Sequence, residues 1–167
     1  IALAGYDWVV TGEICDNIET FNVHPGDLRV KNSAGKRDYI GLGWVPSAKA
    51  ILAGEDYVHT SVHQVTTELD GGPLLAVSAP QPVFLNDLVV ENRTSLLGEA
   101  GSLKEVMKYV RENPEAKDED ITKMFPIYGF ASDCQERLKV HGDWIVFPET
   151  IAGIAQGRRH RCRSGHP

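Results

Sequence analysis

The chain has 167 residues, 42% of them hydrophobic and 24% charged, which is the composition of an ordinary globular domain with one core. It contains no run of about 20 apolar residues that could cross a membrane, and its three cysteines are odd in number and lack the spacing of a disulfide framework or a zinc site. The first residues lack the layout of a secretory signal, so we expect a cytoplasmic protein.

The net charge of −6 is unevenly distributed along the chain. Residues 157–167 hold four arginines and no acidic residue, which leaves 13 Lys and Arg against 23 Asp and Glu, a net −10, in residues 1–156. Affinity for nucleic acid depends on clustered cations, so we do not expect this acidic body to bind nucleic acid. We predict one domain over residues 1–156 and a basic, disordered tail over residues 157–167.

The chain opens with a short apolar run over residues 1–4 that is closed by Gly5. Such a run is typical of a buried parallel strand that ends at a ligand-facing turn. Because it resembles the end of a strand more than the start of a protein, we expect a preceding segment and a domain that is incomplete at its amino terminus. A polar, partly helical stretch is predicted next.

Residues 20–24 alternate with a period of two, which predicts a strand. Asn22 and His24 then lie on one face of this strand, and Phe21 and Val23 lie on the other. Pro25 ends the strand.

The following segments alternate between loops and regular elements. Residues 26–43 are polar and glycine-bearing, as in a long active-site loop, and a helix is predicted from about residue 46 to 54. Residues 57–66 and 74–83 are predicted strands, the second an edge strand because it contains prolines, and residues 69–73 form a tight turn between them.

Helices are predicted in the second half of the chain. Ser102 and Glu105 form a capping box at the start of an amphipathic helix over residues 103–112. A second helix is predicted from residue 119 to about 130, and Pro126 should kink or break it.

A hairpin is predicted near the end, where Gly142 and Asp143 form a two-residue turn between strands at 137–141 and 144–147. Strands separated by helices indicate an α/β fold with a mainly parallel (mixed) sheet flanked by helices. In such sheets ligands bind beyond the carboxyl ends of the strands.

Asn22, His24 and Asp70 all fall at strand ends or in the turns after them, and their chemistry suits acyl transfer to an amine. An amide N–H can hold the oxyanion, an imidazole titrates near neutral pH, and a carboxylate sets its protonation. Each residue alone also has a structural interpretation, since a His before a proline and an Asp-Gly-Gly-Pro turn are common without any catalytic role.

Three segments, at residues 3–6, 21–25 and 60–73, together resemble the signature segments of the 10-formyltetrahydrofolate-dependent formyltransferases. The resemblance is closest to glycinamide ribonucleotide formyltransferase, an enzyme of purine biosynthesis, and it extends over residues 1 to about 85. It implies the carboxy-terminal, catalytic half of a formyltransferase-like domain.

The resemblance implies a one-carbon transferase that moves a formyl group from 10-formyltetrahydrofolate directly to an amine of a small molecule. By this resemblance Asn22 and His24 hold the formyl oxygen, while Asp70 sets the charge of His24 and helps to remove the amine proton. The residues expected to contact the folate are Trp8, Val9, Val10, Thr66, Thr67 and Glu68. The residues expected to line the substrate site are Pro25, Gly26 and His63.

Departures from the family pattern leave several alternatives open. Gly26 stands where a serine is common, and residues 41–44 lack the family's histidines, so the acceptor could be a phosphorylated, nucleotide-linked or other amine. A formyltetrahydrofolate hydrolase, a non-catalytic folate-binding module and a homo-oligomer also remain open. No metal is expected, because His59 and His63 share a face but lack a carboxylate or cysteine at ligand spacing.

Overall fold

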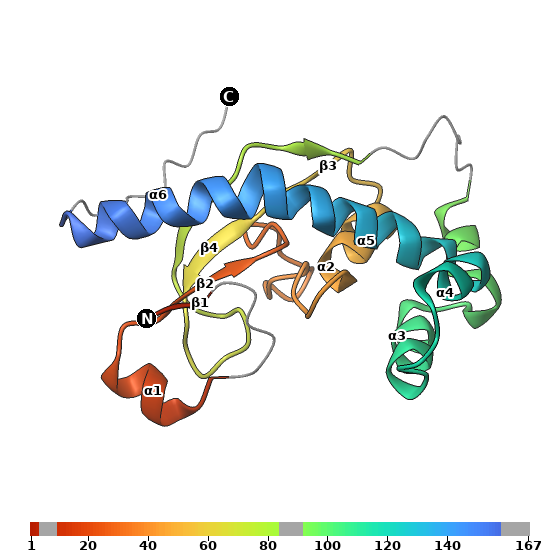
Figure 1. Cartoon of the computed structure of the whole chain (residues 1–167), viewed down its shortest axis with the longest axis horizontal. Coiled ribbons are helices and arrows are strands. Elements are labelled where there is room, and N and C mark those ends of the chain that lie inside the picture. The colour runs from red at the N-terminus through yellow and green to blue at the C-terminus, as the bar shows by residue number, and fades with distance from the viewer. Residues whose placement is uncertain (4–9, 84–91, 158–167) are drawn as a thin grey trace.

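The computed structural model describes residues 1–3, 10–83 and 92–157. At its centre is a mixed four-stranded sheet in the order β1-β2-β4-β5 (Figure 1). Its strands are β1 (Ala2–Leu3), β2 (Phe21–His24), β4 (Ser61–Gln64) and β5 (Leu74–Val77). The α/β fold with a mixed sheet that the sequence indicated is confirmed.

The parallel share of this sheet is smaller than the sequence indicated. Strand β1 pairs in parallel with β2, whereas the β2–β4 and β4–β5 pairs are antiparallel. The connection between β4 and β5 is too short for a parallel crossover, which needs about a dozen residues or more. Strand β1 lies at the sheet edge and is partly exposed, so the expectation of a buried first strand is wrong.

Each of the two strands expected between residues 57 and 83 is divided in two. The first becomes β3 (Tyr57–Val58) and β4, and the second becomes β5 and β6 (Gln81–Pro82). Strands β3 and β6 pair with each other in a separate two-stranded sheet. At the break, the backbone N–H of Thr60 donates to the Ser78 hydroxyl over 3.0 Å, so a side chain takes the place of a ladder carbonyl.

Local signals predicted several helix ends correctly, but the helix expected from residue 119 to about 130 is two helices that together extend to residue 138. The helices are α1 (Gly12–Asn17), α2 (Val45–Ala53), α3 (Leu103–Glu112), α4 (Asp118–Met124) and α5 (Pro126–Leu138), with a 3₁₀ helix η1 at Arg93–Ala100. Gly54 ends α2 in the left-handed region, and the Ser102 side chain caps α3 as predicted. Pro126 separates α4 from α5. Within these described ranges, no helix is long and apolar enough to span a membrane.

The predicted hairpin around residues 142–143 is wrong, because this part of the chain is helical. Helix α5 continues through a π-helical segment η2 (Lys139–Asp143) into α6 (Trp144–Ala155). A Cβ atom on Gly142 would lie 2.5 Å from the Thr60 hydroxyl oxygen, so the glycine permits a close approach of the helix to the sheet. The Thr60 hydroxyl donates to Asp143 over 2.6 Å. Contact with the sheet therefore accounts for the Gly-Asp pair.

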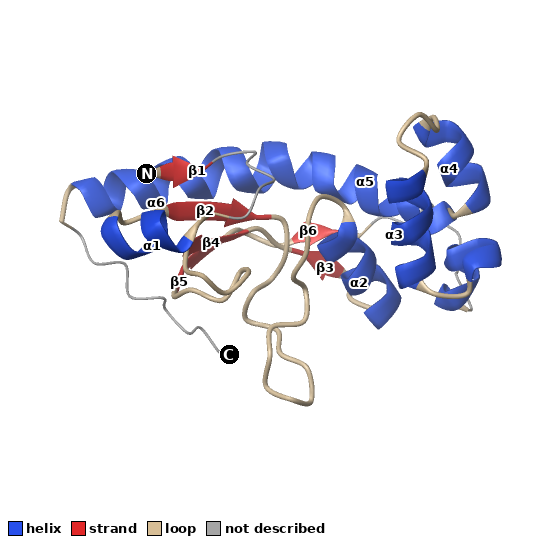
Figure 2. Cartoon of the chain, turned by 90° about the horizontal axis from the view of Figure 1, so that it is seen from below, coloured by secondary structure: helices blue, strands red, loops and turns tan. Residues whose placement is uncertain are grey.

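Helix α6 runs across one face of the four-stranded sheet, as Figure 2 shows. Val146 and Phe147 of this helix form an apolar cluster with Val62, and Phe21 and Val23 pack against it. The predicted alternation of β2 is thereby confirmed, since its apolar residues face the helix. Asn22 and His24 consequently lie on the opposite face.

A larger apolar cluster joins α2, α3, α4, α5 and η1 at the other end of the long helix. It includes two edge-to-face aromatic pairs, Trp44 with Tyr128 and Tyr109 with Phe125, whose ring centroids are 5.3 and 5.2 Å apart. The helical part thus has a core of its own beside the sheet.

Candidate functional site

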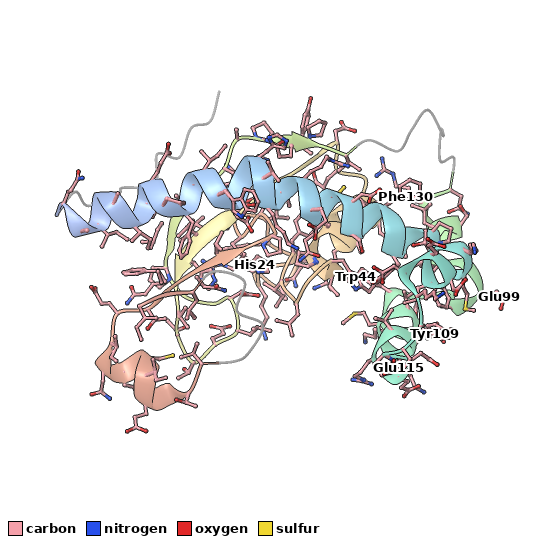
Figure 3. The ribbon with its side chains drawn as sticks, viewed as in Figure 1. His24, Trp44, Glu99, Tyr109, Glu115 and Phe130 are labelled. Atoms are coloured by element: carbon pink, nitrogen blue, oxygen red, sulfur yellow. The ribbon has the colours of Figure 1, made fainter. Side chains whose placement is uncertain are left out.

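His24 lies at the carboxyl end of β2, near the middle of the molecule (Figure 3). Its residue surface is only 3% exposed. Nε2 lies 2.7 Å from the Tyr39 carbonyl oxygen, and since a carbonyl can only accept, this nitrogen carries a proton and donates it. Nδ1 lies 3.5 Å from a carboxylate oxygen of Asp70. The imidazole is therefore held between a carbonyl group and a carboxylate.

Asp70 occupies the tight turn that the sequence predicted between β4 and β5. Its φ of 51° lies in the left-handed region, which Asp tolerates better than most residues. One carboxylate oxygen lies 3.6 Å from Nε2 of His63, and the other accepts a 3.4 Å hydrogen bond from the Gly41 N–H. This buried carboxylate consequently faces two imidazoles at once.

Burial and charge pairing act in opposite directions on the pKa values of His24 and Asp70. Burial lowers the pKa of His24, although the Asp70 carboxylate and the Tyr39 carbonyl act in the opposite direction. Burial alone would raise the pKa of Asp70, but His63, His24 and the Gly41 N–H together hold it below its usual range. The carboxylate therefore stays charged inside the protein.

Asn22 lies on the same face of the sheet as His24 and is paired in register with His63 on β4. It is half-buried, in contrast to His24 and Asp70. The predicted Asn, His and Asp thus come from two distant stretches of chain and meet at one end of the sheet. Their catalytic roles remain predictions.

Four of the residues predicted to contact the folate, Val10, Thr66, Thr67 and Glu68, are in the part of the chain that the structure describes. Thr66, Thr67 and Glu68 follow β4, with Thr66 half-buried and the other two exposed. A Cβ atom on Gly12 would lie 3.5 Å from the Thr67 methyl group, so the start of α1 lies against this loop. Val10, just before α1, is half-buried, whereas Trp8 and Val9 lie outside the described residues.

Pro25 and Gly26, predicted to line the substrate site, border a cavity of about 140 Å³. A Cβ atom on Gly26 would lie 2.4 Å from the Tyr39 carbonyl oxygen and 2.8 Å from Nε2 of His24. Any larger residue would therefore disturb the His24–Tyr39 hydrogen bond. This contact gives a physical reason for the departure from serine at this position.

No motif in the sequence indicates that Tyr39 and Arg37 take part in the site. The Arg37 guanidinium donates to the backbone carbonyl of Asp70, and Tyr39 supplies the carbonyl that binds His24. The Lys49 ammonium donates to the Ile40 carbonyl over 2.7 Å, which fastens the same loop to α2. A backbone acceptor carries no sequence signature, so only the fold reveals this role.

Among the described residues, no group of three or more His, Cys, Asp and Glu is arranged to hold a metal ion.

No family model and no curated protein matches the sequence. Several solved structures do match the fold. The chain is similar to solved formyltransferases.

Phosphoribosylglycinamide formyltransferase from Campylobacter jejuni matches with 24% identity and a TM-score of 0.40, over 55% of this chain and 42% of that one. The Bacillus halodurans enzyme of the same name matches with 16% identity and a TM-score of 0.40, over 85% and 55%. A Mycobacterium tuberculosis protein with an inferred sugar N-formyltransferase activity matches with 16% identity and a TM-score of 0.39, over 96% and 47%. The chain spans about half the length of these structures.

Proposed function

We propose that this protein transfers a formyl group from 10-formyltetrahydrofolate to an amine of a small molecule. The observation that carries the proposal is the position of Asp70, whose carboxylate lies 3.5 Å from His24 and 3.6 Å from His63 on the face of the sheet where Asn22 also lies. An amide donor, an imidazole and an ionised carboxylate are the groups that acyl transfer to an amine requires.

In the proposed reaction the amine nitrogen attacks the formyl carbon, and the bond between that carbon and N10 of the folate breaks. The amine loses one proton and N10 gains one, so the products are a formamide and tetrahydrofolate. Asn22, half-buried, donates its amide N–H to the oxygen on which charge develops. Asp70 accepts the amine proton, directly or through a water molecule.

In this proposal His24 acts through the charge of its ring and not as a hydrogen-bond donor to the formyl oxygen. Its Nε2 proton is committed to the Tyr39 carbonyl, and its Nδ1 faces Asp70. When protonated, the ring would stabilise the oxyanion by its charge. Direct donation to the formyl oxygen would require Tyr39 to release Nε2.

We assign the pterin ring to the space between the stretch that ends at Val10 and the loop of Thr66, Thr67 and Glu68. The proximity of Gly12 to Thr67 supports this assignment, because it places the start of α1, which follows Val10, against that loop. Backbone N–H and C=O groups of such loops can recognise a pterin, which would make the pocket tolerant of side-chain changes.

A second candidate is hydrolysis of 10-formyltetrahydrofolate, with water as the acceptor. It is favoured by the burial of His24 and Asp70, which are 3% and 7% exposed and so are more accessible to water than to a bulky amine. The same three residues would serve both reactions. Only the acceptor would differ.

The test is to incubate the protein with 10-formyltetrahydrofolate, with and without amines that include glycinamide ribonucleotide, and to measure tetrahydrofolate and formate. Amine-dependent release of tetrahydrofolate without formate supports the transferase, and formate release without an amine supports the hydrolase. Folate binding with no turnover under any condition would contradict both.

Asp70→Asn should lower turnover by about 100- to 10⁴-fold, the usual contribution of a proton-transferring group. Asn22→Ala should lower it by about 100- to 1000-fold, as for the loss of one oxyanion donor. Asp120→Asn is the charge-matched control, because Asp120 is exposed on α4. Unimpaired turnover in Asp70→Asn, with circular dichroism like that of the original protein, would refute the proposed role.

A further inference from the structure

Asp70 is not among the residues that line the cavity beside Pro25 and Gly26. The cavity is bordered by Gly26 and Tyr39, whose backbones lie against the Nε2 side of the His24 ring. Asp70 lies on the Nδ1 side of the same ring. Occupation of the cavity therefore does not require the formyl-transfer chemistry proposed above.

Two carboxylates, Asp27 and Glu55, give the cavity an acidic lining, and there is no Lys or Arg among its described lining residues. The Asp27 carboxylate is 11% exposed and paired with Arg29 over 2.7 Å. Burial would raise the pKa of Asp27, but the hydrogen bonds from Arg29 hold it below its usual value. Glu55 accepts a 2.7 Å hydrogen bond from the Tyr39 hydroxyl. Both carboxylates can accept further hydrogen bonds.

His59 adds an acceptor close to Asp27. Its Nδ1 lies 3.1 Å from the Ser78 carbonyl oxygen, so this nitrogen carries a proton and donates it. In the neutral ring Nε2 then bears a lone pair, and it lies 4.0 Å from a carboxylate oxygen of Asp27. One group that donates to both of these acceptors would satisfy them together.

Ser47 supplies a third polar group, at the start of α2. It lines the cavity and is 1% exposed, yet its hydroxyl oxygen has no hydrogen-bond partner among the described residues. A buried hydroxyl without a partner is costly, so such groups in proteins usually meet a ligand or water.

We propose that this cavity binds a small molecule through a primary ammonium group. The ammonium would donate to Asp27, to Nε2 of His59 and to the Ser47 hydroxyl, matching its three N–H bonds to three acceptors. The apolar part of the ligand would contact Ala50 and Val58, which line the same cavity. A volume of about 140 Å³ is below the usual range for drug-sized ligands, so the ligand has only a few non-hydrogen atoms.

The first test is a titration of the ¹⁵N-labelled protein with ethanolamine, followed by two-dimensional NMR. We expect saturable shifts of the amide signals of Asp27, Ser47 and His59. Ethylene glycol is the matched uncharged probe and should bind at least about tenfold more weakly, since hydrogen bonds to charged groups are the stronger ones. Equal binding of the two probes, or no saturable shift with ethanolamine, would overturn the proposal.

The second test uses two variants of the lining. Asp27→Asn and Ser47→Ala should each weaken ethanolamine binding about tenfold. Because the Ser47 hydroxyl has no partner in the free protein, Ser47→Ala should leave the thermal midpoint unchanged or raise it. Ser33→Ala, on the exposed part of the loop, is the control. Unaltered affinity in both lining variants would exclude the site, whatever the formyl-transfer assay shows.

Discussion

The sheet end that holds His24 and the helical end of the molecule are stabilised in different ways. Around His24 the buried residues are polar, among them Ser61, His63 and Asp70, and they depend on hydrogen bonds and ion pairs. The helical end is held by buried apolar side chains from α2, α4, α5 and η1. We infer that the helical end supplies most of the free energy of unfolding. The sheet end contributes less, because its buried polar groups are costly to remove from water.

The largest expected effect on stability belongs to the helical end. Ile127 in α5 is completely buried in the apolar cluster. Ile127→Ala should lower the free energy of unfolding by about 2–5 kcal/mol, because it removes buried methyl groups and leaves a cavity. Urea unfolding checks the value, and Met124→Ala, at a side chain that is 39% exposed, is the control. A loss as small as that of the control would contradict the inferred contrast.

At the sheet end, stability should depend on backbone contacts more than on apolar burial. A Cβ atom on Gly72 would lie 1.8 Å from the Gln64 carbonyl oxygen. Gly72→Ala should therefore cost about 1–3 kcal/mol, as overpacking does, and displace the Asp70 turn. Gly12→Ala is the matched control, since its Cβ would meet only the Thr67 methyl group at 3.5 Å. Similar thermal midpoints for the two variants would contradict this prediction and show that the turn can shift to accommodate a Cβ atom at residue 72.

The amino terminus of α3 offers a smaller and purely local test. The Ser102 side chain accepts from the Glu105 N–H and donates to the Glu105 carboxylate over 2.7 Å. Ser102→Ala should lower stability by about 1 kcal/mol, the usual contribution of such a cap, without any change in folate binding. Chemical denaturation and a folate-binding assay measure the two quantities, and a change in folate affinity would mean that the two ends are coupled.

The pH dependence of stability should distinguish the sheet end from the helical end, and it should appear only below neutral pH. Because burial lowers the pKa of His24 below 6.5, the unfolded chain takes up a proton before the folded one does, so stability falls as the pH drops below about 6.5. The lowered pKa of Asp70 adds a further loss below about pH 3.8.

His24→Gln should flatten the first of these losses, while a glutamine amide can still donate to the Tyr39 carbonyl. His141→Gln, on the exposed side of η2, is the control. Unfolding measured between pH 7 and 5 distinguishes them. An unchanged profile in His24→Gln would mean that the acid sensitivity arises elsewhere.

Local signals in the sequence were sufficient for much of the fold. The alternation around His24 correctly predicted which residues of β2 face the helix, and the capping box at Ser102 correctly predicted the start of α3. Both depend on contacts between near neighbours in the chain. The meeting of His24 with Asp70 was predicted from their positions at strand ends and in the turns after them, and from the family resemblance.

Features that depend on distant contacts were missed. Gly142 and Asp143 form a good turn by local preference, but their contacts with Thr60, 83 residues away from Asp143, favour the helix instead. The hydrogen bond from His24 to the Tyr39 carbonyl was missed for the same reason, since any residue could supply that carbonyl. The cavity lined by Ser47 and His59 likewise appears only after the chain has folded.

The π-helical segment at Lys139–Asp143 determines which side of α6 faces the sheet. Each residue turns an α-helix by roughly 100°, so deletion of one residue there would leave α6 helical but rotate its sides about the axis. Val146 and Phe147 would turn away from the sheet, and other side chains of α6 would take their place. The π-helical segment thus orients a helix that begins in the helical end so that its apolar side packs against the sheet.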